Sequence, residues 1–458
     1  MKNCNTSWHR IVTGALATLA ISGTAFGQSA DSLIDKLVDK GILTVKEANE
    51  LREQADQDFN RVYSVKSGMP DWVTALKING DFRARFDNIF IPNKQLAPGV
   101  AASTDRMRFR YRLRAGITAV LHDNFEVGLR LTSAEPYGAF GGDPISGNAS
   151  YKDNGSKKFV FLDLAYAKWT ALNNPDWKLE LAVGKMENPL VFSDLVFDGD
   201  YTPEGYSLQL TRHLNEKHSL GFTAGFFPLD EITAAAHDPM LLAGQLRLDS
   251  HWSEKISSSL GLAGLLLGGS DNLGNGAVAN VRGGNTRDAA GNLVHDFTPL
   301  VADASFTYLL DKFPLHDGPF PIKVMGDYLH NFSVGNRNIG WSAGFQLGKA
   351  GKRGSWQIGY NYKQLEADAW YEEFGDSDTG AFYGAIPASW AAGAASGYVP
   401  GTNLRGHVIR LAYSPFDSTT ITASYYHFDT IKDYPSLAPA SKNDGLAGRL
   451  IVDIMWKF

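Results

Sequence analysis

From residue 75 to the end of the chain, hydrophobic and polar residues alternate with a period of two. The stretch "LKINGDFRARF" (76–86) is typical, and "DRMRFRYRLRAG" (105–116) has an arginine at every second position. Because successive side chains of a β-strand point to opposite faces, each such segment predicts a strand with one apolar and one polar face. We expect sixteen strands, near residues 76–89, 105–120, 124–133, 158–170, 177–187, 205–213, 217–227, 240–250, 254–268, 300–311, 320–332, 338–349, 353–366, 402–414, 418–430 and 446–458.

The connections between these strands alternate between short turns and long loops, with one exception near 333–337. The short turns include "HDN" (122–124), "NNPD" (173–176) and "PFDS" (415–418). Outer-membrane barrels have tight periplasmic turns, extended outer loops and an even number of antiparallel strands. The last strand, "GRLIVDIMWKF" (448–458), ends in an aromatic residue, which resembles the assembly signal of such barrels. The pattern therefore predicts an all-β transmembrane fold over 75–458, an antiparallel outer-membrane β-barrel of about sixteen strands.

A different pattern precedes the barrel. The stretch "DSLIDKLVDKG" (31–41) has hydrophobic residues at helical spacing and ends at a glycine. The stretch "TVKEANELREQA" (44–55) opens with a capping box from Thr44 to Glu47. These signals predict a short helical module at 28–56 and a polar linker at 57–74. The module is either a helical hairpin or oligomerisation element, or a plain pair of solvated helices.

The first 27 residues predict a cleaved secretory signal peptide, because Lys2 and Arg10 precede the apolar stretch "IVTGALATLAISGTAFG" (11–27). The single cysteine, Cys4, lies in this leader, so the mature chain is expected to contain no disulfide and no cysteine-based metal or catalytic site. The formal net charge of −6 becomes −8 without the two leader cations, which argues against a nucleic-acid partner. We expect the mature protein in the bacterial outer membrane.

The arginine run decides which face of its strand meets lipid. A lipid-facing arginine costs roughly 2–4 kcal/mol at the bilayer midplane, so five would cost on the order of 10 kcal/mol, comparable to a domain's whole stability. The apolar residues between the arginines are therefore expected to face lipid. The arginines should face an aqueous interior, because sixteen-stranded barrels are too wide to be filled by side chains. The predicted pore-lining residues are Arg83, Arg85, Arg106, Arg108, Arg110, Arg112, Arg114, Asp81 and Glu126.

Guanidinium groups about 7 Å apart along a strand repel one another unless negative charges lie opposite. The candidates on inward faces are Asp81, Glu126, Asp163 and Asp453. Two interpretations stay open, and both can hold. The arginines form a cationic wall that attracts anionic solutes, or they belong to a salt-bridge network that holds the barrel wall together.

The long loop within "GKMENPLVFSDLVFDGDYTPEGYSL" (184–208) mixes acidic residues with apolar ones that an outer loop in water has little use for. We expect it to fold inward and narrow the pore, with its acids opposite the arginines; a surface loop with local packing is the alternative. The predicted constriction residues are Asp194, Asp198, Asp200 and Glu204. The second candidate is the loop at 367–401, with Glu372, Glu373, Asp376 and Asp378.

Five stretches give the chain a resemblance to the putative porin family of Gram-negative bacteria, whose members begin with a short helical segment before the barrel. They are "LVDKGILTVKEANEL" (37–51), "DRMRFRYRLRAG" (105–116), "FLDLAYAKW" (161–169), "GKMENPLVFSDLVFDGDYTPEG" (184–205) and "GTNLRGHVIRLAYSP" (401–415). The resemblance implies an outer-membrane channel and, by analogy to general porins, a homotrimer. It leaves the solute open.

The predicted function is passive diffusion of small hydrophilic solutes and ions through a porin with an arginine-lined wall. An anion- or phosphate-selective channel is the alternative. It is ranked lower because the arginine ladder, the row of arginines at every second position of 106–114, is concentrated on one strand and the mature chain is acidic. A non-conducting structural or adhesive outer-membrane barrel is the second alternative. An enzyme is not expected, since the sequence has no GxSxG, HExxH, Walker or dinucleotide motif. No cofactor or metal is expected, and the expected partners are outer-membrane lipid, solutes and further copies of the chain.

Overall fold

The computed structural model describes residues 70–90, 106–135, 145–233, 237–273, 283–288, 292–316, 318–380, 401–431 and 447–458. The chain divides into two compact units, Met1–Leu76 and Lys77–Phe458, of which the second forms the barrel. The strands are β1 (Val73–Phe90), β2 (Arg106–Leu121), β3 (Phe125–Ala134), β4 (Ala149–Ser150), β5 (Phe159–Asn173), β6 (Trp177–Lys185), β7 (Glu204–His213), β8 (His218–Pro228), β9 (Met240–His251), β10 (Ile256–Gly268), β11 (Pro299–Leu310), β12 (Phe320–Asn331), β13 (Ile339–Gly348), β14 (Trp356–Leu365), β15 (Leu404–Phe416), β16 (Thr419–Thr430) and β17 (Ala447–Lys457). Two short 3-10 turns are described, η1 (His122–Asn124) and η3 (Ser270–Asn272).

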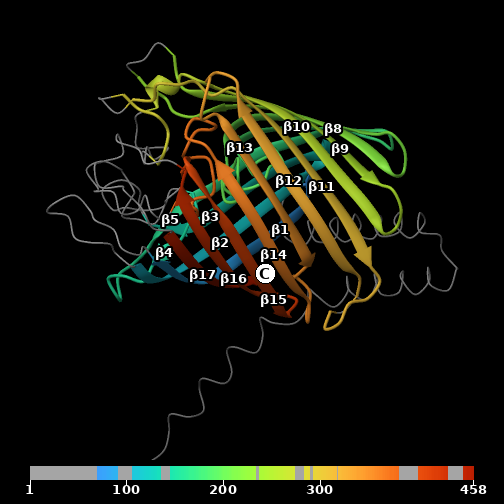
Figure 1. Ribbon diagram of the computed structural model, residues 1–458. Helices are drawn as coiled ribbons and strands as arrows, with labels where there is room; N and C mark the ends of the chain where they lie inside the picture. The colour runs from blue at the N-terminus through green and yellow to red at the C-terminus, as the bar shows by residue number, and fades with distance from the viewer. Residues whose placement is uncertain are drawn as a thin grey trace, which may run out of the picture. The chain divides into compact units, whose positions relative to one another are not determined.

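The strands pair with their neighbours in chain order and form one closed sheet. Apart from the two-residue β4, each strand pairs with the next, and β17 returns to pair with β1 (Figure 1). Neighbouring strands run antiparallel, as β9 does to β10 and β15 to β16. A closed sheet has no free edge, so the backbone N–H and C=O groups that a membrane would leave without water are paired between strands.

The end of the chain takes part in the closure. The Phe458 amide donates to the Gly80 carbonyl (3.1 Å), and the Gly80 amide donates to the Phe458 carbonyl (2.9 Å). One step further along, Phe82 lies opposite Trp456, with their ring centroids 5.8 Å apart. The aromatic C-terminal strand therefore seals the barrel against β1.

The outer face of the barrel is apolar at mid-strand positions. Phe222 on β8, Leu246 on β9 and Leu262 on β10 lie side by side in register, and each is two-fifths to one-half exposed. The next residues along, Gln245 and Ala263, point inward and are 1% exposed. This alternation is what a wall between hydrocarbon and an enclosed interior requires.

The predicted sixteen-stranded antiparallel barrel is confirmed, since each expected segment coincides with one long strand. The strand β4 is an addition that the sequence did not reveal, because two residues are too few for a period to show. The predicted signal peptide (1–27) and helical module (28–56) lie outside the described residues, as does most of the predicted linker (57–74). These three remain predictions.

Among the described residues, no helix is both long enough and apolar enough to cross a membrane.

A hydrophobic cluster lies inside the barrel. It joins inward residues of β9 to β12, such as Ala243, Leu265 and Val301, with residues of the β6–β7 loop (186–203) and of the described part of the β14–β15 loop (366–380). Both loops are thus attached to the inner wall, and they position the polar groups described below.

A wall with an apolar outer face and a polar inner face predicts that an added charge destabilises the barrel more on the outer face than on the inner one. Leu246→Arg places a charge on the outer face and should lower the free energy of unfolding by about 2–4 kcal/mol. The matched variant Thr422→Arg places it on the inner face of β16, beside a polar cavity, and should change that free energy by less than about 1 kcal/mol. Urea unfolding in lipid vesicles measures both, and equal losses would contradict the assignment of the two faces.

Candidate functional site

The arginines of β2 point into the barrel. Arg108, Arg110 and Arg112 are 8%, 1% and 2% exposed, whereas the intervening Met107 and Phe109 are 64% and 51% exposed. This is the orientation that the cost of a lipid-facing arginine favours. Arg106 and Arg114, at the two ends of the run, are half-buried.

Strand β1 adds four charged side chains to the same inner face. Asp81, Arg83, Arg85 and Asp87 alternate with outward residues, and all four are buried. Because charged groups in such a position are stable only when they are paired and hydrogen-bonded, the neighbouring strands must supply partners. They do so through the β2 arginines and through Arg449 and Asp453 of β17.

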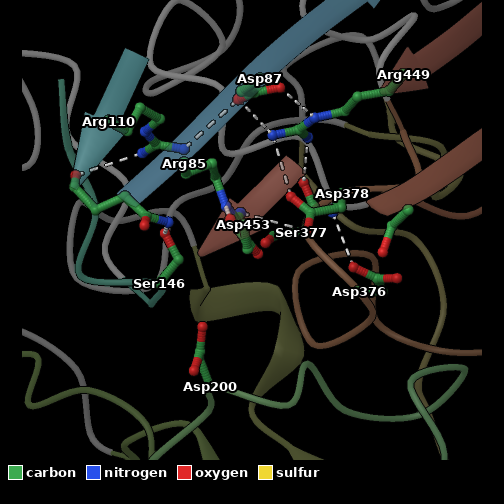
Figure 2. A network of polar contacts seen from close by, with 12 residues as sticks. Arg85, Asp87, Arg110, Ser146, Asp200, Asp376, Ser377, Asp378, Arg449 and Asp453 are labelled. Carbon is green, nitrogen blue, oxygen red and sulfur yellow. Dashed lines mark hydrogen bonds and ion pairs between the residues drawn. The ribbon is translucent and has the colours of Figure 1, made fainter. Parts of the chain in front are cut away.

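Asp87 is the centre of this network. The Arg108 Nε and Nη2 atoms donate to its carboxylate at 2.8 and 2.5 Å, and the Arg449 Nε and Nη2 atoms at 2.9 and 3.0 Å. The Arg110 guanidinium lies 3.8 Å away on the other side. Figure 2 shows Asp87 between Arg110 and Arg449. One fully buried carboxylate thus joins three guanidinium groups from two strands.

A second set of contacts involves the β6–β7 loop. Asp200 accepts from Arg112 Nη1 (2.8 Å) and lies 3.7 Å from Arg83 and 3.5 Å from Arg114. Asp81 accepts from the other side of Arg112 (3.2 Å) and from Arg114 Nε (2.7 Å). The predicted pairing of an acidic loop with the arginine ladder is therefore present at Asp200.

The β14–β15 loop approaches the same wall. Asp378 lies 3.1 Å from Arg449 Nη2 and 3.7 Å from Arg85 Nη1, and Arg85 also donates twice to Asp453, at 2.7 and 2.8 Å. In Figure 2, Asp378 and Ser377 lie beneath the Arg449 guanidinium. The second candidate loop thus also supplies counter-charge.

The two loops are packed against each other. Phe197 of the first loop contacts Trp370 and Phe374 of the second, with ring centroids 6.0 and 5.4 Å apart. The Trp370 indole donates to the Val196 carbonyl (2.8 Å), and the Asp198 amide donates to the Phe374 carbonyl (2.7 Å). Apolar residues of the first loop, such as Val196 and Phe197, are therefore buried where the two loops meet inside the barrel.

Carboxylates also lie at this contact. Asp194 is 2.5 Å from Lys363 Nζ on the inner face of β14, and Asp376 is 3.4 Å from the same amine. Asp198 accepts from the backbone amides of Ser377 (2.9 Å) and Asp200 (2.8 Å). Asp198 thus holds the two loops together through main-chain hydrogen bonds, and within the described residues it forms no ion pair with a cation.

The surroundings shift the acidities of these loop groups in opposite directions. Burial, followed by the charges of Asp200 and Asp376, raises the pKa of Asp198 to about 8. Burial also raises the pKa of Asp376 to about 6, although Lys363 opposes the shift. For Asp200 burial is outweighed by the arginines Arg112, Arg83 and Arg114, which hold its pKa well below the ordinary value.

Some predicted site residues lie elsewhere. Glu126 accepts from the Tyr166 hydroxyl (2.6 Å) and lies 3.4 Å from Lys168, near the η1 turn. Glu204 is exposed at the start of β7, 3.2 Å from Lys185. Asp163, a candidate partner of the ladder, pairs instead with Arg130. These three acids thus lie near turns or pair with cations of other strands, and they do not contact the arginines of β2 in the described residues.

Other residues of the network were missed. Asp87 shares the parity of Arg83 and Arg85 within "FRARFDN", so its inward position could have been read from the alternation. Ser146 and Asn148 could not, because they belong to a short segment (145–150) without a regular pattern. That segment is buried over the ladder, and Asn148 accepts from Arg83 Nη2 at 2.7 Å through its side-chain oxygen.

A polar cavity of about 530 Å³ lies beside this network. Its lining includes Asp194, Asp200 and Asp378 at the loops, and Thr422 along the inner face of β16. It extends to Lys457, which pairs with the short β15–β16 turn through the Ser418 carbonyl. The lining thus reaches from the inward-folded loops to the short-turn end of the barrel. Within the described residues, no group of three or more His, Cys, Asp or Glu side chains is placed to hold a metal ion.

Comparison with known proteins gives one family match. Residues 91–264 match the family described as "Putative porin", which confirms the resemblance seen in the sequence for that part of the chain, less than half of its length. No curated protein sequence matches the chain.

Several solved structures have a similar fold. The Pseudomonas putida OprB structure is 9% identical, covers 84% of this chain and 94% of its own, and has a TM-score of 0.49. A loop deletion mutant of OmpT, an outer membrane protein of Vibrio cholerae, is 11% identical (84% and 99% covered, TM-score 0.41). A triple mutant of the Rhodopseudomonas blastica porin is 10% identical (84% and 100% covered, TM-score 0.38). At these identities the similarities do not bear on function, and the description of the barrel rests on its own strand pairing.

The buried network predicts a large cost for removing its central carboxylate. Asp87→Asn leaves three guanidinium groups without their shared anion and should lower the free energy of unfolding by about 3–5 kcal/mol. The control Asp311→Asn breaks an exposed pair with Lys255 and should cost less than about 1 kcal/mol. Urea titration of the refolded barrel measures both, and a small loss for Asp87→Asn would show that the network does not stabilise the wall.

The loop contact predicts a pH dependence. Since the pKa of Asp198 is raised above its unfolded value, the folded state holds an extra proton and loses stability as pH rises from about 4 to about 8. Asp198→Asn keeps an acceptor oxygen without the charge, so it should reduce the loss of stability between pH 5 and pH 8.5, while Asp123→Asn in a turn should behave like the wild type. Urea midpoints at the two pH values test this, and an unchanged slope in Asp198→Asn would contradict the role given to this carboxyl.

Proposed function

Taking the resemblance to the putative porin family as the premise, we propose that this protein is an outer-membrane porin that lets small hydrophilic solutes and ions diffuse passively. The closed barrel with an apolar outer face and a charged inner face supports this function, as does the family match. Both favour a channel over an enzyme. Export through the predicted signal peptide and assembly into homotrimers, by analogy to general porins, belong to the same proposal.

The observation that carries the proposal is the polar cavity. It runs beside the loops and along the inner faces of β14 to β17, with charged side chains such as Asp200, Arg410 and Lys457 in its lining. A sixteen-stranded barrel is wide enough to leave an aqueous passage when its loops do not fill it. In this proposal the passage follows the polar cavity along the inner faces of β14 to β17.

The charges beside this passage define its selectivity. Arginines of β1 and β2 contact the acids of the two loops directly, at 2.8 Å for Arg112 with Asp200 and 3.7 Å for Arg85 with Asp378. Because Arg85, Asp200 and Asp378 all line the polar cavity, a solute in it meets both signs of charge. Rings and rows of charged side chains are the usual means by which pores select ions. Because each sign is present, we infer general diffusion with a modest ion preference.

Anion selectivity remains the second candidate, and one observation favours it. Within the described residues, the network contains seven arginines (Arg83, Arg85, Arg108, Arg110, Arg112, Arg114, Arg449) and five paired aspartates (Asp81, Asp87, Asp200, Asp378, Asp453). The surplus of positive charge is located on the wall and not on the loops.

Bilayer recording tests the channel and the role of the loop acids together. Purified wild-type protein should conduct in planar bilayers, and its reversal potential under a salt gradient should report the ion preference. Combined replacement of Asp194, Asp198 and Asp200 by Asn should move that potential toward the anion equilibrium potential, because Lys363 and Arg112 each lose one of their two carboxylate partners.

The control Asp230→Asn/Glu231→Gln neutralises acids of the β8–β9 loop and should leave the reversal potential as it is. If the triple replacement also leaves it unchanged, the loop acids do not face the ion path. If the wild-type protein carries no current, the channel proposal fails and the structural barrel is favoured.

A further inference from the structure

Part of the arginine ladder is hydrogen-bonded to neutral oxygens of the protein itself. The Ser146 carbonyl accepts from both Arg83 Nη2 and Arg112 Nη1, each at 3.3 Å, and the Asn148 carbonyl accepts from Arg110 Nη2 at 3.4 Å. The Asn148 side-chain oxygen accepts from Arg83 Nη2 at 2.7 Å. We call residues 145–150 the capping segment, because it places three neutral oxygens on three guanidinium groups.

These contacts leave guanidinium donors unused. The Nε atoms of Arg83 and Arg112 are buried and have no hydrogen-bond partner within the described part of the chain. Three of the four bonds to the capping segment are 3.3–3.4 Å long, beyond the usual range for a strong N–H···O bond. Hydrogen bonds between two charged groups are shorter and about twice as strong. An anion at this site would therefore form stronger hydrogen bonds with the arginines than the neutral oxygens of the capping segment do.

Within the described residues, Asp200 is the carboxylate that both Arg83 and Arg112 contact; Arg112 also bonds to Asp81 (3.2 Å), and Arg110 lies 3.8 Å from Asp87. Asp200 is 2.8 Å from Arg112 and 3.7 Å from Arg83. Asp200 and the Ser146 carbonyl accept from the same Arg112 nitrogen, Nη1, at 2.8 and 3.3 Å, and Figure 2 shows Asp200 below Ser146. Arg83 therefore makes its short hydrogen bond to the neutral Asn148 oxygen (2.7 Å) and lies 3.7 Å from the carboxylate of Asp200.

The capping segment pairs with the barrel wall over a short stretch, and Glu135 also accepts from the Ser150 amide (3.1 Å) and hydroxyl (3.4 Å). Its strand β4 pairs with β2 at only two positions, Arg110 with Ser150 and Tyr111 with Ala149. Gly147 allows the close approach: its φ is +63°, and a Cβ atom there would lie 2.5 Å from Thr132 Oγ1 and 3.3 Å from Arg112 Cδ. A side chain at Gly147 would push the segment off the arginines.

From this arrangement we propose that Arg83, Arg110 and Arg112 form an oxyanion-binding site, and that the capping segment occupies it in place of a solute. A carboxylate, sulfate or phosphate group displaces the Ser146 and Asn148 oxygens and takes their hydrogen bonds. The inference rests on the proposed water-filled interior. It adds a binding site for oxyanions and identifies the capping segment as the part of the chain that competes with them. Because the two compete, weakening the capping segment strengthens anion binding by the same factor.

Hydrogen exchange of the full chain in detergent tests the competition without any current. Inorganic phosphate should raise amide exchange in the capping segment about fivefold or more at saturation, sulfate and acetate should act in the same direction, and chloride at equal ionic strength should not. An equal response to chloride would show simple screening and overturn the proposal. No response to phosphate would also overturn it.

Variants test the site by affinity. Gly147→Ala and Asn148→Ala weaken the capping segment and should lower the phosphate concentration that half-saturates the response, by about fivefold or more. Asn148→Asp gives Arg83 an internal carboxylate and should raise that concentration. The control is Gly155→Ala, in the same β3–β5 connection, where φ is +86° but nothing lies within 4 Å of the added methyl group; it should match the wild type.

If Gly147→Ala fails to fold, Asn148→Ala and Asn148→Asp still give opposite predicted shifts. Wild-type affinity in both would overturn the proposal. The failure of the channel itself is recognised separately, as absence of current in bilayers together with an intact exchange response to phosphate.

Discussion

The structure depends on a single constraint, the cost of placing charge or unpaired backbone in hydrocarbon. Every strand of the closed sheet must be paired on both sides, and every charged side chain at membrane depth must point inward. Leu246 and Gln245 illustrate the result on neighbouring positions of β9, since one is exposed to the outside and the other is 1% exposed inside. The chain end obeys the same constraint, because Phe458 bonds to Gly80 and leaves no free edge at the joint.

Arginines that point inward avoid the cost of contact with lipid, but they bring positive charges close together inside the barrel. Guanidinium groups crowded on β1 and β2 need anions, and a buried carboxylate such as Asp87, which is 0% exposed, needs cations. The network satisfies both by combining three adjacent strands with two loops. The salt-bridge interpretation and the cationic-wall interpretation therefore describe different parts of one arrangement: Asp87 is enclosed in the wall, whereas Arg85 and Asp200 border the polar cavity.

The sequence predicted most of the fold and part of the site, for physical reasons. Strand positions follow from a period of two that lipid enforces over many residues, so all sixteen long strands could be located. The inward fold of the β6–β7 loop could be inferred from Phe197 and its apolar neighbours, but its partner Trp370 is 173 residues further along the chain, and no local pattern encodes that contact. Asn148 shows the same limit, because its role depends on a backbone turn at Gly147 that brings neutral oxygens to the ladder. Glu126 was expected opposite the arginines but bonds to Tyr166 instead. Alternation predicts which face of the sheet a residue lies on, but not how far along the barrel axis it lies.

The central claim, that one face of each strand meets lipid and the other an aqueous interior, is tested most directly by single-cysteine labelling along β16. The protein's only native cysteine, Cys4, is replaced by serine, and cysteine is then placed at Thr420, Ile421, Thr422, Ala423 and Ser424 in turn, in vesicle-reconstituted protein. A membrane-impermeant thiol reagent should label positions 420, 422 and 424, which line the cavity, and spare 421 and 423. Uniform labelling, or the opposite alternation, would contradict the account.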